Sequence, residues 1–317
     1  MKTSFNPLKI EPLAGDASLR SFYRLFLKDG TTVIKMLTPA EQCEDHEKYL
    51  QILKFFQANS LPVPGLLEAD ERELAIYLED LGDKDYYQIH SEIDAEARFK
   101  WYREFIGVIA RIGALKNDFK NDIHLNIEIL GYDRLLWELN YFLEQYLIFR
   151  NIILSDSDLK RIRSWFESLA SRISRFPTTL CHRDFHSKNI MIRNNSPYLV
   201  DFQDTRIGPY NYDLASLIWD SYVSLDENLI NEMQDYYYNH LELLEIRINS
   251  EDYRIQNRLT ALQRNIKAIG TFASQSNKGN RNYIHFIQPT WEKVFQHLRF
   301  INKDNLTESI LSKLASI

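Results

Sequence analysis

One motif of acidic and amide residues, interrupted by two apolar stretches, restricts the fold of this chain more than any other feature. His182-Arg183-Asp184 opens the motif, and Asn189 follows Asp184 after five residues. The apolar stretch that follows ends in a turn at 193–197, and a second apolar stretch then leads to Asp201. The sequence therefore predicts a loop, a strand, a turn and a second strand that ends in an acid, which is the context in which this spacing carries chemistry.

The three polar groups of this motif are those that phosphoryl transfer from ATP requires. A carboxylate at Asp184 would orient an acceptor hydroxyl and take its proton. The Asn189 amide oxygen and the Asp201 carboxylate would hold Mg²⁺ on the phosphates, because a hard cation prefers oxygen ligands. The motif predicts an ATP- and Mg²⁺-dependent kinase. The alternative is a polar loop in which Asp184 only caps a helix.

Further polar residues surround the motif. His182 is expected to be structural, whereas His186 and Lys188 could touch substrate or phosphate, or simply be solvated. Asp204 could contact the metal or the acceptor. Asp213, near the start of a predicted helix, is expected to cap that helix or to brace the catalytic loop.

The N-terminal region carries candidates for nucleotide binding. Lys35 ends an apolar run and could meet the α- and β-phosphates, held by a helix carboxylate such as Glu47 or Glu44. The alternative is a strand lysine that faces solvent. The loop 15–18, which ends at Ser18, could close over the phosphates through its backbone N–H groups.

The backbone from Tyr77 to Asp80 is predicted to join two lobes. Its N–H and C=O groups at Tyr77 and Glu79 could meet the adenine edge between apolar walls. Farther along the chain, Arg264 and Lys267 share one face of a predicted helix. They form either a solvated surface or an anion site.

The hydrophobic periodicity predicts an α+β fold with a small antiparallel-sheet N-terminal lobe at 1–82 and a larger helical C-terminal lobe at 83–317. Asp29-Gly30 predicts a tight hairpin in which both turn residues have positive φ. The stripe from Leu135 to Tyr146 is expected to be core. The expected strands are 10–13, 22–27, 31–36, 66–69 and 74–78, and the expected helices are 39–59, 92–115, 133–148, 156–175, 212–223, 226–246, 250–275 and 305–316.

Composition narrows the class of protein. The net charge of -6 comes from 38 basic and 44 acidic residues and argues against a dedicated nucleic-acid partner. No apolar stretch is long enough to span a bilayer, and the N-terminus has no apolar signal region. The two cysteines, Cys43 and Cys181, form no metal or redox motif. A cytoplasmic protein with a nucleotide and a small molecule as its partners is expected, without a membrane partner.

Taken together, the motifs resemble those of the aminoglycoside phosphotransferase/choline kinase superfamily, which are relatives of protein kinases. More narrowly, they are similar to bacterial kinases that phosphorylate the anomeric hydroxyl of N-acetylmuramate and N-acetylglucosamine in cell-wall recycling. The resemblance implies a protein-kinase-like two-lobe fold, ATP and Mg²⁺ as cofactors, and an amino-sugar acceptor. The segments that carry it are 15–18, 78–83, 132–136, 182–187, 201–204 and 263–267.

Three other functions compete with this interpretation. A protein kinase needs a long peptide platform after the metal-binding acid, and here few residues separate Asp201 from the helical run at Asp213. An antibiotic kinase for aminoglycosides would favour an acidic pocket for its cationic substrates, which the net charge permits. A pseudokinase that acts as a binding module is disfavoured, since Asp184, Asn189 and Asp201 are all present.

Overall fold

The computed structural model describes residues 5–13, 19–122, 125–126, 128–301, 311–312 and 314–315. These residues form two compact units. Unit 1 takes its described residues from 1–92, 117–126 and 188–205, and unit 2 from 93–116, 127–187 and 206–317. Both units are discontinuous in sequence, whereas the lobe boundary at residues 82–83 divides the linear chain and stays a prediction.

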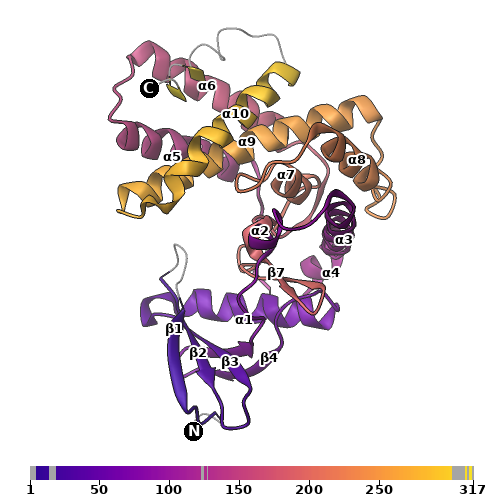
Figure 1. The fold of residues 1–317 in the computed structure, drawn as a ribbon. Coiled ribbons are helices and arrows are strands. Elements are labelled where there is room, and N and C mark those ends of the chain that lie inside the picture. The colour runs from indigo at the N-terminus through magenta and orange to yellow at the C-terminus, as the bar shows by residue number, and fades with distance from the viewer. Residues whose placement is uncertain are drawn as a thin grey trace. The chain divides into compact units, whose positions relative to one another are not determined.

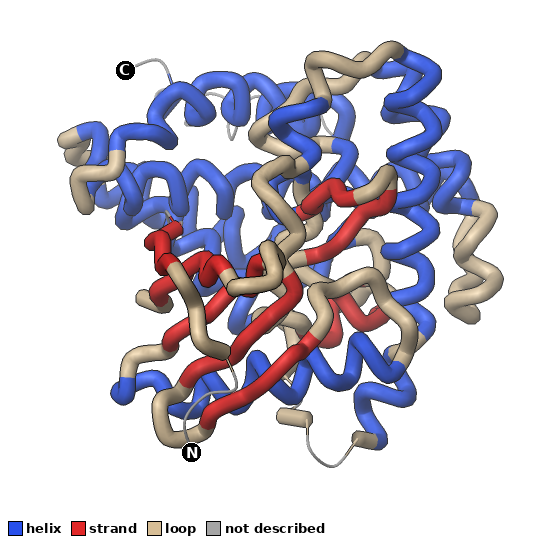
Figure 2. The backbone as a smooth tube through the Cα atoms, turned by 60° about the horizontal axis from the view of Figure 1, so that its bottom comes forward, coloured by secondary structure: helices blue, strands red, loops and turns tan. Residues whose placement is uncertain are grey.

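Unit 1 contains an antiparallel sheet of five strands (Figures 1 and 2). The first three strands follow one another as a meander, and β5 then pairs with β3, which leaves β4 at the edge. Because all neighbours are antiparallel, short connections suffice. The strands are β1 (Lys9–Leu13), β2 (Ser21–Phe26), β3 (Thr32–Leu37), β4 (Leu66–Asp70) and β5 (Ala75–Glu79).

The two faces of this sheet have different roles. On one face a small core forms around Leu25, Val33, Ala75 and Tyr77. Successive side chains of a strand point to opposite faces, so Ile34 lies on the other face. That second face borders the cavity described below.

A helix and its buried stripe fix the segment that follows Asp201. The 3₁₀ turn η1 (Ala40–Gln42) leads into α1 (Cys43–Ala58), which runs alongside the strands in Figure 1. The predicted stripe is buried at Tyr49, Ile52, Leu53 and Phe56. The rings of Tyr49 and Phe56 lie 4.8 and 5.7 Å from the ring of Phe202, so α1 anchors the residue next to Asp201.

Two hairpins of unit 1 use different turns. Between β2 and β3 the positive φ belongs to Gly30, at 83°, and not to Asp29, so the expected two-residue turn with two positive φ angles is wrong. The loop is longer, with the Leu27 N–H bonded to the Thr31 carbonyl. The motif hairpin of β7 (Ile190–Arg193) and β8 (Ser196–Leu199) instead has positive φ at both Asn194 and Asn195. Asn tolerates this conformation better than most residues.

Unit 2 consists mainly of helices, with one two-stranded antiparallel ribbon of β6 (Thr178–Cys181) and β9 (Arg206–Pro209). Six predicted helices are confirmed, although α7 and α8 end earlier than expected. The remaining prediction at 305–316 lies mostly outside the described residues. The helices are α3 (Ala95–Ala114), α5 (Tyr132–Arg150), α6 (Asp156–Ile173), α7 (Tyr212–Ile218), α8 (Glu227–Tyr238), α9 (Ser250–Asn277) and α10 (Ile284–Ile301).

One long helix and several short elements were not expected. The proline at 289 lies inside α10, and a proline normally argues against a helix interior, which explains why the sequence did not indicate this helix. The strands β6 and β9 have four residues each, too few for a clear alternation. The other short elements are α2 (Tyr86–Ile89), α4 (Lys116–Asn121), η2 (Ser187–Asn189) and η3 (Arg281–Tyr283).

Helix α9 forms the centre of unit 2 and packs against α5 and α10 (Figure 1). The backbones of α9 and α5 approach closely at Gly270, where an added Cβ would lie 2.6 Å from the Phe142 Cα. A glycine is therefore required at this crossing. Phe142 in turn packs edge-on against Phe166 of α6 and Trp291 of α10.

We predict that Gly270→Ala lowers the free energy of unfolding by about 1–3 kcal/mol, because the backbone of α5 must move to admit the methyl group. Gly107 of α3 is the matched control, since a Cβ there meets no atom within 4 Å. Gly107→Ala should stabilise the chain by about 0.5–1 kcal/mol. Urea titrations of both variants measure the difference, and equal effects would contradict the inferred contact.

Candidate active site

The backbone of the catalytic loop is held by a carboxylate from α7. The chain leaves β6 at Cys181, and the next two residues, His182 and Arg183, are buried. Their backbone N–H groups donate to the two carboxylate oxygens of Asp213, at 2.7 and 2.8 Å. Asp213 therefore braces the loop, as the sequence predicted. Arg183 has a φ of 77°, which is uncommon for a residue other than glycine and needs such support.

The Arg183 side chain pairs with Glu138 of α5. Both side chains are 1% exposed. The other oxygen of Glu138 accepts a hydrogen bond from Gln263 of α9 at 2.9 Å, and Arg134 lies 3.4 Å from the first. The sequence analysis missed Glu138, because it lies within the apolar stripe of α5 and its partner is 45 residues away.

We predict that Glu138→Gln destabilises the protein by about 3–5 kcal/mol, because the Arg183 charge stays buried without its counter-charge. Chemical denaturation monitored by circular dichroism measures this loss. Lys100→Gln removes the exposed ion pair with Glu96 on α3 and is the control, with an expected change of less than about 1 kcal/mol. A similar stability in both variants would show that the Arg183–Glu138 pair does not anchor the loop.

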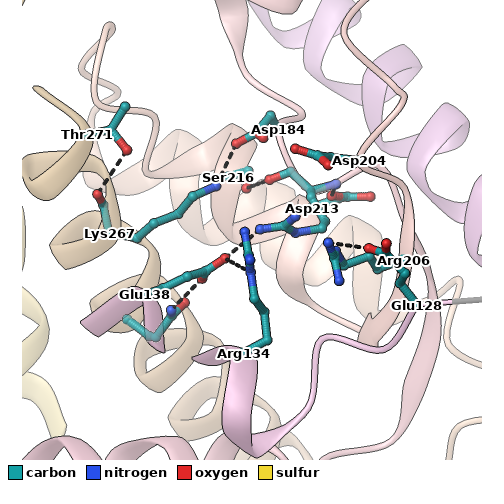
Figure 3. A network of polar contacts seen from close by, with 12 residues as sticks. Glu128, Arg134, Glu138, Asp184, Asp204, Arg206, Asp213, Ser216, Lys267 and Thr271 are labelled. Atoms are coloured by element: carbon teal, nitrogen blue, oxygen red, sulfur yellow. Dashed lines mark hydrogen bonds and ion pairs between the residues drawn. The ribbon is translucent and has the colours of Figure 1, made fainter. Parts of the chain in front are cut away.

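Asp184 forms an ion pair with Lys267 of α9, with 3.0 Å between Nζ and Oδ1 (Figure 3). The side chains are 25% and 19% exposed, so solvent reaches the pair. Burial alone would raise the pKa of Asp184, but the charges of Lys267 and Arg183 outweigh burial and hold that pKa well below its usual range. The Asp184 charge likewise raises the pKa of Lys267 against the effect of burial. Both groups are therefore charged at neutral pH.

Two other predicted residues also interact with Asp184 electrostatically. Arg264 is buried, and its Nε donates to the Ser216 hydroxyl at 2.5 Å. Its Nη1 is buried and has no hydrogen-bond partner among the described residues. The ring of His186 lies 5.0 Å from the Tyr222 ring, and burial lowers the pKa of His186 to about 4, which leaves it neutral at pH 7.

We predict that Lys267→Met moves the acid limb of kcat/KM to higher pH. Lys267 is the strongest of the charges that lower the pKa of Asp184, so its removal raises that pKa. If Asp184 is the base, activity is then lost as pH falls through the higher pKa. We expect the acid limb to move up by about 1–3 pH units. The pH–rate profile tests this, and Lys267→Arg, which keeps the charge, should retain the wild-type limb.

Unit 1 contains a separate cavity of about 570 Å³. Residues from the sheet, from the strand end 78–83 and from the motif segment 188–203 line it. Leu13, Phe22, Ile34, Leu78, Met191 and Val200 supply apolar walls, and polar groups gather at Arg20, Arg24, Asp80, Lys188, Asn189 and Asp201. Apolar walls with a few convergent polar groups are typical of a ligand site.

Both expected metal ligands border this cavity. The Val200 N–H donates to the Asn189 carbonyl at 3.1 Å, which holds the two segments together. Asp201 has a positive φ of 63°, and its carboxylate accepts a hydrogen bond from Gln203 at 2.6 Å. An amide oxygen and a carboxylate fit Mg²⁺, which completes its shell with water and substrate phosphate. Among the described residues no three His, Cys, Asp or Glu side chains gather around a common metal position.

The strand end at the cavity has fixed backbone partners. The Glu79 N–H donates to the Gly65 carbonyl at 2.8 Å, and the Glu79 carboxylate accepts from the Gly65 N–H and pairs with Arg193. The Gly82 N–H donates to the Asp80 carboxylate at 2.9 Å. Adenine recognition by this segment stays a prediction.

Other predicted nucleotide residues lie elsewhere in unit 1. Lys35 pairs with Glu73 at 3.0 Å and lies over the ring of Tyr77, on the sheet face opposite to Ile34. Its expected partner Glu47 instead accepts a hydrogen bond from Gln51. The expected Lys35–Glu47 pairing is therefore wrong, because strand alternation turns Lys35 away from the cavity.

Three further residues had been predicted to contact nucleotide, metal or substrate. Ser18 lies outside the described residues. Asp204 is 4.0 Å from Lys48 of α1. Lys188 borders the cavity, with its Nζ 5.4 Å from the centre of the Tyr87 ring.

Sequence reasoning missed Arg20 and Arg24, which both border the cavity. Arg24 binds Asp80 through two hydrogen bonds and also pairs with Asp83 at 2.7 Å. The sequence contained a signal for them, since Arg20, Phe22 and Arg24 occupy every second position and would share one face of an extended segment.

Comparisons with known proteins agree with this geometry. Residues 9–246 match the model of the phosphotransferase enzyme family. An N-acetylmuramate/N-acetylglucosamine kinase of Neisseria meningitidis serogroup B is 26% identical over 268 residues, which cover 82% of this chain and 76% of that protein. A kinase of the same name from Pseudomonas aeruginosa is also 26% identical, over 84% of this chain and 77% of its own length.

Solved structures show the same fold. The gentamicin complex of the aminoglycoside phosphotransferase APH(2")-IIa has a TM-score of 0.64 and 13% identity, with 92% of each chain covered. The choline kinase LicA from Streptococcus pneumoniae has a TM-score of 0.62 and 13% identity, over 91% of this chain and 94% of its own. At these identities the likeness concerns the fold alone.

The chain thus belongs to the phosphotransferase enzyme family. It is an ATP-dependent kinase with the protein-kinase-like α+β fold that the sequence predicted. None of the helices in the described residues is long and apolar enough to cross a membrane.

Proposed function

We propose that this kinase transfers the γ-phosphoryl group of ATP to the anomeric hydroxyl of N-acetylmuramate or N-acetylglucosamine. The observation that carries the proposal is the 26% identity, over more than four fifths of this chain, to kinases named for those two sugars. The same proposal places the reaction in the cytoplasm, where ATP is available, as a step that recovers cell-wall sugars.

Asp184 is the proposed proton acceptor. Its carboxylate stays ionised at neutral pH because Lys267 and Arg183 stabilise the charge. An anomeric hydroxyl is more acidic than other sugar hydroxyls, so one carboxylate suffices as its base. The new O–P bond forms as the bond from the γ-phosphorus to the bridging oxygen breaks, ADP leaves, and the hydroxyl proton moves to Asp184.

Asn189 and Asp201 are the proposed ligands of Mg²⁺. When bound, the ion neutralises phosphate charge and orients the triphosphate. The chain's own contribution is to present two oxygen ligands at the edge of the cavity, tied by the Val200–Asn189 hydrogen bond.

The segment after Asp201 supports a small acceptor. Four of its residues form β9, which pairs with β6, and α7 begins at Tyr212. A peptide substrate would need an extended platform in this part of the chain. For the muramate form, Arg264 is the proposed partner of the lactyl carboxylate, because Lys267 is engaged by Asp184 while the Arg264 Nη1 has no partner among the described residues.

The decisive experiment is phosphorus NMR of the product formed from each free sugar and from its methyl glycoside. We expect a sugar 1-phosphate from the free sugar and no product from the glycoside. Phosphorylation of the glycoside, or activity on aminoglycosides alone, would refute the proposed acceptor. Absence of any ATP turnover while ATP still binds would favour the pseudokinase.

We predict that Asp184→Asn lowers kcat by about 10²- to 10⁴-fold, because the amide keeps the shape of the carboxylate but accepts no proton. ATP affinity should stay near the wild-type value. Steady-state kinetics and calorimetry measure the two quantities, and the exposed Asp118→Asn is the control for a change of charge alone. A variant at Asp184 with near-normal kcat would remove this residue from the reaction.

A further inference from the structure

Strand β3 presents no cation to the cavity of unit 1. Ile34 borders the cavity, and Met36 lies on the same face by alternation, whereas Lys35 points to the opposite face. A nucleoside triphosphate carries several negative charges, and a kinase site neutralises them partly with a fixed side-chain cation. The cation must come from another element.

Three basic residues border the cavity, and each has a partner within unit 1. Arg24 is held by Asp80 and Asp83, whose two negative charges exceed its single positive charge. The Lys188 ammonium lies over the Tyr87 ring. The third basic residue is Arg20, which directly precedes β2 and lies beside Asp201.

Arg20 lies close to Asp201, the proposed ligand of Mg²⁺. Its Nη2 is 3.9 Å from Oδ1 of Asp201, its guanidinium carbon lies 5.5 Å from the centre of the Tyr49 ring, and its Nη1 is 4.0 Å from the sulfur of Met36. The side chain is 11% exposed, so its charge is poorly screened by water. The ring and the sulfur fix the guanidinium, while 3.9 Å is longer than a direct hydrogen bond to Asp201.

We propose that Arg20 binds the phosphate groups of the nucleotide and takes the place expected for Lys35. A guanidinium binds phosphate oxygens through two parallel hydrogen bonds, which also orients them. Its position beside Asp201 lets one phosphate contact both Arg20 and the ion that Asp201 would hold. The inference deepens the proposed function and rests on ATP binding in this cavity.

The test compares ADP, AMP and adenosine binding to the whole protein by calorimetry, with Mg²⁺ and with EDTA. In Arg20→Met we expect ADP affinity to fall by about 10- to 100-fold in both conditions. Adenosine affinity should stay unchanged, because it has no phosphate. Arg20→Lys should recover part of the loss, since it keeps the charge but not the paired hydrogen bonds.

Lys35→Met is the matched control, with the same change of side chain on the other face of the sheet, and ADP affinity should stay at the wild-type value. If Arg20→Met binds ADP with wild-type affinity, this inference is overturned and the proposed function is not. A loss of ADP affinity that occurs with Mg²⁺ but not with EDTA would also overturn it, because Arg20 would then act through Asp201. An equal loss for adenosine would mean a distorted cavity and overturn it too. A wild-type protein that binds no ADP or ATP would overturn the proposed function together with this inference.

Discussion

The buried pair of Arg183 and Glu138 is the interaction on which the catalytic loop depends. An arginine with 1% exposure is costly to bury, and a carboxylate from α5 with its own hydrogen bonds offsets that cost. With the side chain of Arg183 held on one side and its backbone N–H held by Asp213 on the other, Asp184 has little freedom of position. The loop therefore derives its geometry from contacts with α5, α7 and α9, and these contacts position the carboxylate that we propose as the base.

The charges in unit 2 keep Asp184, the proposed base, ionised and make it a weak base. Lys267 and Arg183 keep Asp184 ionised, which reduces its affinity for a proton. Such a group suits an acceptor hydroxyl that loses its proton late, as the phosphoryl group arrives, and in a loose transition state the nucleophile needs little activation in advance. Orientation of the hydroxyl then matters more than the strength of the base.

Local motifs were predictable from the sequence, whereas partners distant in the sequence were not. Asp184, Asn189 and Asp201 lie within one short segment whose turns and apolar runs determine its structure, so the sequence sufficed to propose them as site residues. Lys267 was found as a candidate, but its contact with Asp184 spans 83 residues and could not be derived from spacing. Lys35 shows a different limit, because a shift of one residue moves a strand side chain to the other face of the sheet. The register of β3 with β2 and β5 decides this, and the register depends on the completed sheet.

The short stretch between Asp201 and α7 has a consequence for control of the enzyme. Many switches operate by ordering or disordering a long segment beside the site. Here that stretch is occupied by β9, whose four residues are paired with β6, and the carboxylate that neutralises Arg183 is part of the chain and needs no added phosphate. The loop is thus assembled when the protein folds. All of these contacts lie within unit 2, so among the described residues the loop needs neither an added group nor the ordering of a long segment beside it.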